Sequence, residues 1–184
     1  MRKVVYGINQ TLDGCCDHTK SSGSEDIHVY FSDLLRQADL IVYGRKTYEL
    51  MVPFWPDVAK EQNMPETVNE FARVFDSIDK LVFSRTLKSV EDKKSRLVNT
   101  DPVEELLRLK QEPGRDISLG GVELPLKLIE AGLVDEFHIV VHPVIVGEGR
   151  RLFDGIDIKE KLQLKLAESK VLPSGCVALK YVKE

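Results

Sequence analysis

The sequence predicts an α/β fold in which about eight strands form a mostly parallel sheet, with helices on both faces and an antiparallel hairpin at the C-terminal end. Two observations predict this fold. Short apolar runs alternate with amphipathic helical segments through most of the chain, as in a parallel sheet with crossover helices. The last two segments, residues 162–169 and 177–182, instead alternate apolar and polar side chains around Pro173, Ser174 and Gly175, which is typical of a hairpin.

The segments follow one another in a regular order. Predicted strands occupy residues 4–8, 40–43, 81–83, 96–98, 117–119 and 136–145, before the hairpin. Predicted helices occupy residues 27–37 and 66–75, a segment from Pro102 to about Lys110, and a segment that ends at Gly132. A loop is expected over residues 9–25 and another over residues 53–56, where two prolines bracket Phe54 and Trp55. We expect Asp26 and Asp101 to cap the helices that follow them.

Length and composition limit the class of protein. The chain has 184 residues, 42% of them hydrophobic and 30% charged, which predicts a single domain over residues 1–184. A net charge of −4 without a long basic run argues against a nucleic-acid partner. No stretch of about 18 apolar residues and no signal peptide is present, so no membrane partner is expected. Three cysteines without a disulfide framework fit the cytoplasm, where we expect the protein to be found.

Gly120 and Gly121 end a short apolar strand and precede a helix. The start of a helix carries unpaired N–H groups and the positive end of the helix dipole, so a phosphate can bind there if no side chain blocks it. Pro125 fits the first turn, where a missing N–H breaks no helical hydrogen bond. Taken alone, a glycine pair before a helix more often marks only a tight turn that binds nothing.

Two further clusters stand at predicted strand ends, and together the three sets favour a cofactor with several phosphates. The predicted cofactor-binding residues are Gly44, Arg45 and Thr47, then Ser84, Arg85 and Thr86, and then Gly120, Gly121 and Val122. Because the carboxyl ends of parallel strands share one edge of a sheet, these clusters should surround one crevice. An arginine between two hydroxyls suits a terminal phosphate monoester, which predicts NADPH rather than NADH.

The order of these motifs resembles the dihydrofolate reductase-like family. They are Thr11-Leu12-Asp13-Gly14, Tyr43-Gly44-Arg45-Lys46-Thr47-Tyr48-Glu49, Ser84-Arg85, Gly120-Gly121, Gly132-Leu133-Val134-Asp135-Glu136 and Pro143-Val144-Ile145-Val146-Gly147-Glu148-Gly149. The branch most similar is the reductase domain of the bifunctional riboflavin-biosynthesis deaminase-reductase. The resemblance implies a dihydrofolate reductase-like fold, NADPH as hydride donor and a homodimer. It also implies that Arg85 and Ser84 bind the adenosine 2′-phosphate end and that the glycine pair binds the pyrophosphate.

The predicted reaction is hydride transfer to a C=N or C=O bond of a pterin-, pyrimidine- or ribosyl-type molecule, as in 5-amino-6-(5-phosphoribosylamino)uracil reductase. Asp13 and Asp26 are the candidate catalytic residues, with a turn and a helix cap as their structural alternatives. Tyr48 and Trp55 are candidates for the substrate pocket, or else for the core. The family resemblance would place a substrate-binding carboxylate near His28.

Two other functions are also consistent with the sequence. The chain could be a dihydrofolate reductase proper, or a nucleotide-binding protein that does not turn over. His138 and His142 share a strand face but should lie about 13 Å apart, too far to hold one metal ion, so no metal site is expected. Phe137, Ile139 and Val141 line one face of the same strand and suit either a dimer interface or the interior.

Overall fold

The structure is a computed structural model that describes residues 1–20, 23–159 and 161–184. Eight strands form one sheet: β1 Val4–Thr11, β2 Ala38–Gly44, β3 Asp79–Phe83, β4 Ser95–Val98, β5 Asp116–Leu119, β6 Glu136–His142, β7 Leu164–Val171 and β8 Val177–Lys183. Their spatial order is β4-β3-β2-β5-β1-β6-β8-β7. The first six strands of that order are parallel, and β8 runs antiparallel to both β6 and β7. The predicted fold class is confirmed.

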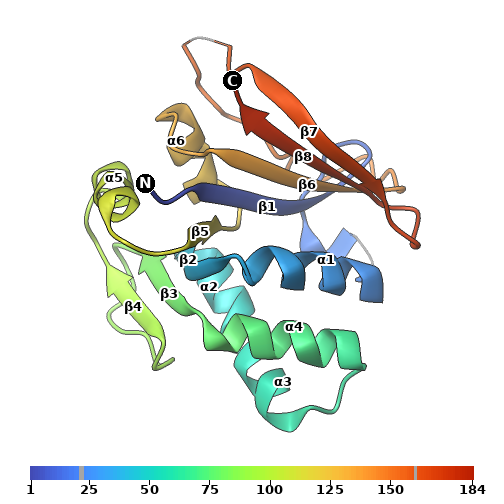
Figure 1. The fold of residues 1–184 in the computed structure, drawn as a ribbon, viewed down its shortest axis with the longest axis horizontal. Helices are drawn as coiled ribbons and strands as arrows, with labels where there is room; N and C mark the ends of the chain where they lie inside the picture. The colour runs from blue at the N-terminus through green and yellow to red at the C-terminus, as the bar shows by residue number, and fades with distance from the viewer. Residues whose placement is uncertain (21–22, 160) are drawn as a thin grey trace.

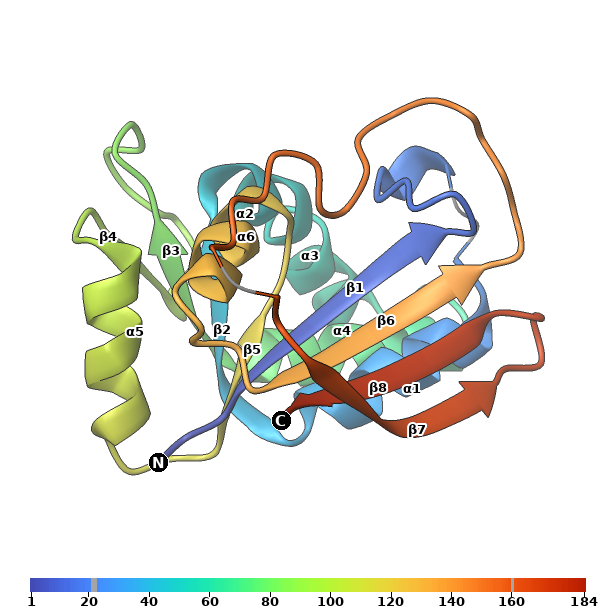
Figure 2. The same cartoon turned by 90° about the horizontal axis from the view of Figure 1, so that it is seen from above.

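Helices cover both faces of the sheet (Figure 1). They are α1 Glu25–Leu35, α2 Arg45–Met51, α3 Trp55–Glu61, α4 Glu66–Ser77, α5 Pro102–Gln111 and α6 Glu123–Glu130, with a short 3-10 helix at His18–Lys20. Apolar side chains of α5 and α6 pack on one face, and those of α1, α2 and α4 on the other. Seen from above, β7 lies at the edge of the sheet furthest from β4 (Figure 2).

The central strands are buried because both faces of the sheet are covered. Val4 and Tyr6 of β1 and Ile117 of β5 have no exposed surface. Phe137 and Ile139 of β6 belong to the same core cluster as these residues. This face of β6 is therefore part of the interior of the protein. The edge strand β7 is instead almost wholly exposed.

Helix starts follow the expected capping chemistry in one case and not in the other. The Asp101 carboxylate accepts hydrogen bonds from the backbone N–H groups of Val103 (2.9 Å) and Glu104 (3.2 Å), so this predicted cap is confirmed. The predicted Asp26 cap is wrong, because Ser24 is the N-cap residue and Asp26 lies in the first turn. Asp26 instead accepts a hydrogen bond from the backbone N–H of Ser174, at 2.7 Å, in the β7–β8 turn.

Proline explains two further differences from prediction. The expected loop at residues 53–56 contains the start of α3, whose first turn accommodates Pro56 without losing a helical hydrogen bond. The strand expected over residues 136–145 ends at His142, because Pro143 has no N–H to donate to a neighbouring strand. The carbonyl oxygen of Val144 then accepts a hydrogen bond from the N–H of Leu12 (2.9 Å), which joins the segments that follow β1 and β6. Residues 21–22 of the predicted loop over residues 9–25 lie outside the described residues.

Candidate active site

A cleft of about 970 Å³ lies along the carboxyl ends of the parallel strands. Every parallel strand contributes to its lining, through Asn9 of β1, Gly44 of β2, Ser84 after β3, Asn99 after β4, Gly120 after β5 and His142 of β6. All three predicted phosphate clusters line this one cleft, with each of their nine residues among the lining set. The topology therefore brings together residues that are far apart in the sequence, as expected for the carboxyl edge of such a sheet.

The glycine pair is required by close packing of the chain against itself. A Cβ on Gly120 would lie 2.6 Å from Cε1 of Tyr43, and Gly121 has a φ of +89° and lies against the Thr47 hydroxyl. The Tyr6 hydroxyl donates a hydrogen bond to the Gly121 carbonyl oxygen at 2.8 Å. The turn before α6 is thus fixed by β1, β2 and α2, and only glycine allows this approach.

The turn after β3 presents hydroxyl and guanidinium donors to the cleft. The Ser84 Oγ accepts hydrogen bonds from the backbone N–H groups of Thr86 (3.1 Å) and Leu87 (3.0 Å). The Ser84 and Thr86 hydroxyls lie 3.4 Å apart and share one hydrogen bond, which leaves one of the two hydroxyl protons for a ligand beside the exposed Arg85 side chain. This donor set suits a terminal phosphate group.

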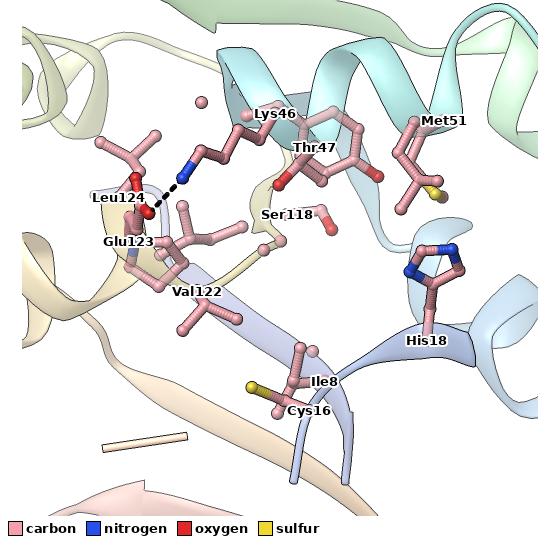
Figure 3. A pocket seen from close by; sticks show the side chains of 18 of the residues that line it. Ile8, Cys16, His18, Lys46, Thr47, Met51, Ser118, Val122, Glu123 and Leu124 are labelled. Atoms are coloured by element: carbon pink, nitrogen blue, oxygen red, sulfur yellow. Dashed lines mark hydrogen bonds and ion pairs between the residues drawn. The ribbon is translucent and has the colours of Figure 1, made fainter. Parts of the chain in front are cut away.

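Helix α2 joins the two ends of the cleft. Its first turn carries Arg45 and Lys46, and its last turn carries Leu50 and Met51. The Lys46 ammonium donates to Glu123 Oε1 at 2.7 Å, a contact drawn in Figure 3. One end of the cleft is therefore basic, and the other is apolar.

The apolar end is built from aromatic rings. Trp55 of α3 packs on Phe71 of α4 with ring centroids 4.5 Å apart, and His28 of α1 lies 5.8 Å from both rings. The His28 Nδ1 is 2.9 Å from the Ser24 carbonyl oxygen and therefore carries the proton. In the neutral ring, Nε2 is then a hydrogen-bond acceptor. Phe31 also lines this end of the cleft, so the apolar end suits a flat ring.

The predicted catalytic carboxylates are not among the described lining residues. Asp13 accepts hydrogen bonds from the Thr11 hydroxyl (2.6 Å) and the Gly147 backbone N–H (2.9 Å), and these lower its pKa to about 2. Burial raises the pKa of Asp26, but hydrogen bonds from Ser24 and Ser174 outweigh it and bring the pKa to about 2. Both carboxylates are therefore ionised at neutral pH and hold loops in place.

The two predicted pocket aromatics have different positions. Trp55 lines the cleft. Tyr48 points into the core, where it is 8% exposed and packs with Phe71 and Phe75, and it is absent from the described lining. The helical turn that places Thr47 at the cleft therefore turns the next side chain away from it.

Several residues that line the cleft were not predicted as site residues, among them Asn9, Cys16, His18, Phe31 and His142. The His142 Nε2 lies 3.0 Å from the Asn9 Oδ1, and burial lowers the pKa of the imidazole, so His142 is neutral at pH 7. His142 ends β6, so the same strand-end rule that selected the phosphate clusters would have found it. Cys16 and His18 come from the loop after β1 and carried no comparable signal.

The described residues contain no group of three or more His, Cys, Asp or Glu side chains placed to hold a metal ion. His138 lies apart from the cleft lining, with its Nδ1 2.8 Å from the Tyr30 hydroxyl. Among residues 1–20, 23–159 and 161–184, no helix has the length and apolar character needed to cross a bilayer.

The strand order and the cleft at the carboxyl ends of the parallel strands are those of a dihydrofolate reductase-like fold. The chain belongs to the RibD C-terminal domain family, whose pattern it matches over residues 2–178. The protein YyaP of Bacillus subtilis strain 168 is 36% identical over 184 residues, covering 98% of this chain and 94% of that protein.

Solved structures share the fold. A putative riboflavin biosynthesis protein from Shewanella sp. PV-4 superposes with a TM-score of 0.75 at 20% identity, covering 100% of this chain and 99% of that chain. Dihydrofolate reductase from Enterococcus faecalis, complexed with NADP(H) and RAB-propyl, gives a TM-score of 0.66 at 14% identity, covering 99% and 96%.

Proposed function

We propose that this protein is an NADPH-dependent reductase that transfers hydride to a C=N or C=O bond of a flat heterocyclic or ribosyl-type small molecule. The observation that carries the proposal is that three phosphate-suited clusters and an aromatic end line one cleft. Membership of the RibD C-terminal domain family supports it, as does the fold shared with a dihydrofolate reductase solved with NADP(H). The uracil derivative 5-amino-6-(5-phosphoribosylamino)uracil is the first substrate to test.

The residues of the chain would bind and orient the reactants. Arg85 and Ser84 would hold a terminal phosphate, while Arg45 and the glycine pair at the start of α6 would hold the others. NADPH supplies a hydride from its nicotinamide ring when bound. Trp55 would pack on a flat substrate and exclude water, and His28 Nε2 would accept a hydrogen bond from a ring N–H. Neither Asp13 nor Asp26 supplies a proton at neutral pH, because both are ionised.

Calorimetric titration with NADPH and with NADH tests the cofactor assignment. We expect micromolar binding of NADPH, and binding about 10- to 100-fold weaker for NADH, because NADH lacks the 2′-phosphate. Arg85→Ala should lose most of this preference. Arg108→Ala is the matched control, because it removes the same charge from the outer face of α5, where Arg108 pairs with Glu105 and Glu112.

Two results would count against the proposal. Failure of the wild-type protein to bind either nucleotide would overturn the reductase function. Equal binding of both nucleotides, unchanged in Arg85→Ala, would overturn the 2′-phosphate assignment alone.

Once binding is established, turnover is measured as the loss of NADPH absorbance with the uracil derivative and with dihydrofolate. Turnover of dihydrofolate alone would identify a dihydrofolate reductase. Binding without turnover of any candidate would favour a nucleotide-binding protein. The expected homodimer is a separate proposal, checked by light scattering.

A further inference from the structure

Glu123 connects three segments at the phosphate end of the cleft. It is the first residue of α6, two positions after Gly121, and its Oε1 accepts hydrogen bonds from Lys46 Nζ (2.7 Å) and Arg150 Nη1 (3.0 Å). Lys46 lies in the first turn of α2 and Arg150 in the segment between β6 and β7, and all three residues line the cleft. Figure 3 shows the Lys46 and Glu123 side chains reaching toward one another from facing elements.

The Glu123 carboxylate resembles a bound anion in its position and in its contacts. It stands at the N-terminus of a helix, where negative charge is favoured, and it pairs with an ammonium and a guanidinium group, the cations to which phosphate groups also bind. The hydrogen bond from Lys46 lowers the pKa of Glu123, which is therefore ionised at neutral pH. The side chain is 55% exposed, and ion pairs that exposed are weak and open easily.

Resting on the proposed function, we infer that Glu123 is a specificity-determining residue that competes with the phosphates of the nucleotide. In the free cleft it holds Lys46 and Arg150. Binding of a phosphate group transfers these two cations from the carboxylate to the ligand. The carboxylate thereby lowers nucleotide affinity and favours ligands whose phosphates can displace it. A residue that merely positioned Lys46 and Arg150 for the ligand would have the opposite effect, because its loss would weaken binding.

Affinity measurements on a double-mutant cycle separate these two roles. NADPH is titrated into wild type, Glu123→Gln, Lys46→Met and the double variant at low salt. We expect Glu123→Gln to bind NADPH about three- to tenfold more tightly, with the gain shrinking as salt rises. Lys46→Met should cost more affinity in the Glu123→Gln background than in wild type, because the ammonium is then fully available to the ligand.

The control variant is Glu130→Gln, at the other end of α6. Glu130 accepts a hydrogen bond from the Asp157 N–H (2.8 Å) and is not in the described lining, so its substitution removes the same charge outside the cleft. We expect NADPH affinity to stay within about twofold of wild type, because no hydrogen bond or ion pair of Glu130 to Lys46 or Arg150 is found among the described residues, and exposed charges that are not in contact interact weakly in water. A gain equal to that of Glu123→Gln would mean that net charge alone acts, and would overturn the inference.

The remaining outcomes are distinguishable from failure of the proposed function. Unchanged or weaker NADPH binding by Glu123→Gln, with wild type still binding, overturns the inference and leaves the reductase proposal standing. If wild type binds no NADPH, the reductase proposal fails, and inorganic pyrophosphate replaces it as the probe. Tighter binding of pyrophosphate by Glu123→Gln than by wild type then supports the inference, and equal binding or none overturns it. Thermal unfolding of each variant confirms that it is folded.

Discussion

Gly121 lies directly against Thr47, so that a Cβ at this glycine would overlap the threonine hydroxyl. The two residues belong to different phosphate clusters, one at the start of α6 and the other in α2. Their contact sets how closely the two clusters approach. The geometry of the phosphate end therefore depends on the absence of a side chain at position 121.

Gly121→Ala should destabilise the protein by about 2–4 kcal/mol. A left-handed backbone costs an alanine about 1–2 kcal/mol, and overpacking against Thr47 adds a comparable amount. Gly155→Ala is the matched control, because Gly155 has a φ of +78° and a Cβ added there would meet no atom of a described residue within 4 Å apart from its chain neighbours, so only the backbone cost applies. Thr47→Ala in the Gly121→Ala background should recover the packing part. Urea unfolding measures all four proteins, and equal losses for the two glycine variants would contradict the packing argument.

Asp26→Asn should lower stability in a pH-dependent way. The folded pKa of Asp26 is about 2, below its unfolded value of about 3.9, so the ionised carboxylate stabilises the fold above pH 3.9. That contribution is lost as pH falls through about 2. At pH 7 we expect a loss of about 1 kcal/mol, because the charge-assisted hydrogen bonds from Ser24 and Ser174 weaken.

The pH profile of unfolding checks this assignment. The stability difference between wild type and Asp26→Asn should be constant from about pH 7 to pH 5 and shrink between about pH 4 and pH 2. Asp33→Asn is the control on the same helix, where the carboxylate is 67% exposed and pairs only with Arg36 among the described residues. A difference that grows on acidification would show that Asp26 is not held as the ionised form.

Much of the fold and part of the site follow from local sequence signals. Strand ends marked by glycine or by Ser84, Arg85 and Thr86 predicted the cleft, because the carboxyl ends of parallel strands always share one edge. The roles of Asp13 and Asp26 depend on the nearby hydroxyls of Thr11 and Ser24 and also on distant partners, Gly147 and Ser174, which no local pattern contains.

The apolar end of the cleft was the least predictable part. His28, Trp55 and Phe71 come from three helices, and their contacts exist only after α1, α3 and α4 pack together. Helical spacing could not decide between Tyr48 and Trp55, because both sit on short helices next to the same cleft and the same core.

Trp55 is the only tryptophan of the chain, so its fluorescence should report directly on the apolar end of the cleft. A pterin or pyrimidine that packs on the indole ring is expected to quench the emission in a saturable way. Trp55→Phe provides the blank. By calorimetry, Trp55→Ala should bind the same heterocycle about 5- to 30-fold more weakly, because an aromatic contact of about 1–2 kcal/mol is lost.

Tyr48→Phe separates this role from that of the neighbouring core. Its side chain is buried with Phe75, and no hydrogen bond of its hydroxyl to another described residue is found, so the variant should keep the heterocycle affinity of wild type. Weakened binding in Tyr48→Phe together with unchanged binding in Trp55→Ala would reverse the assignment. That result would mean that the Tyr48 hydroxyl of α2, rather than the Trp55 ring of α3, contacts the flat substrate.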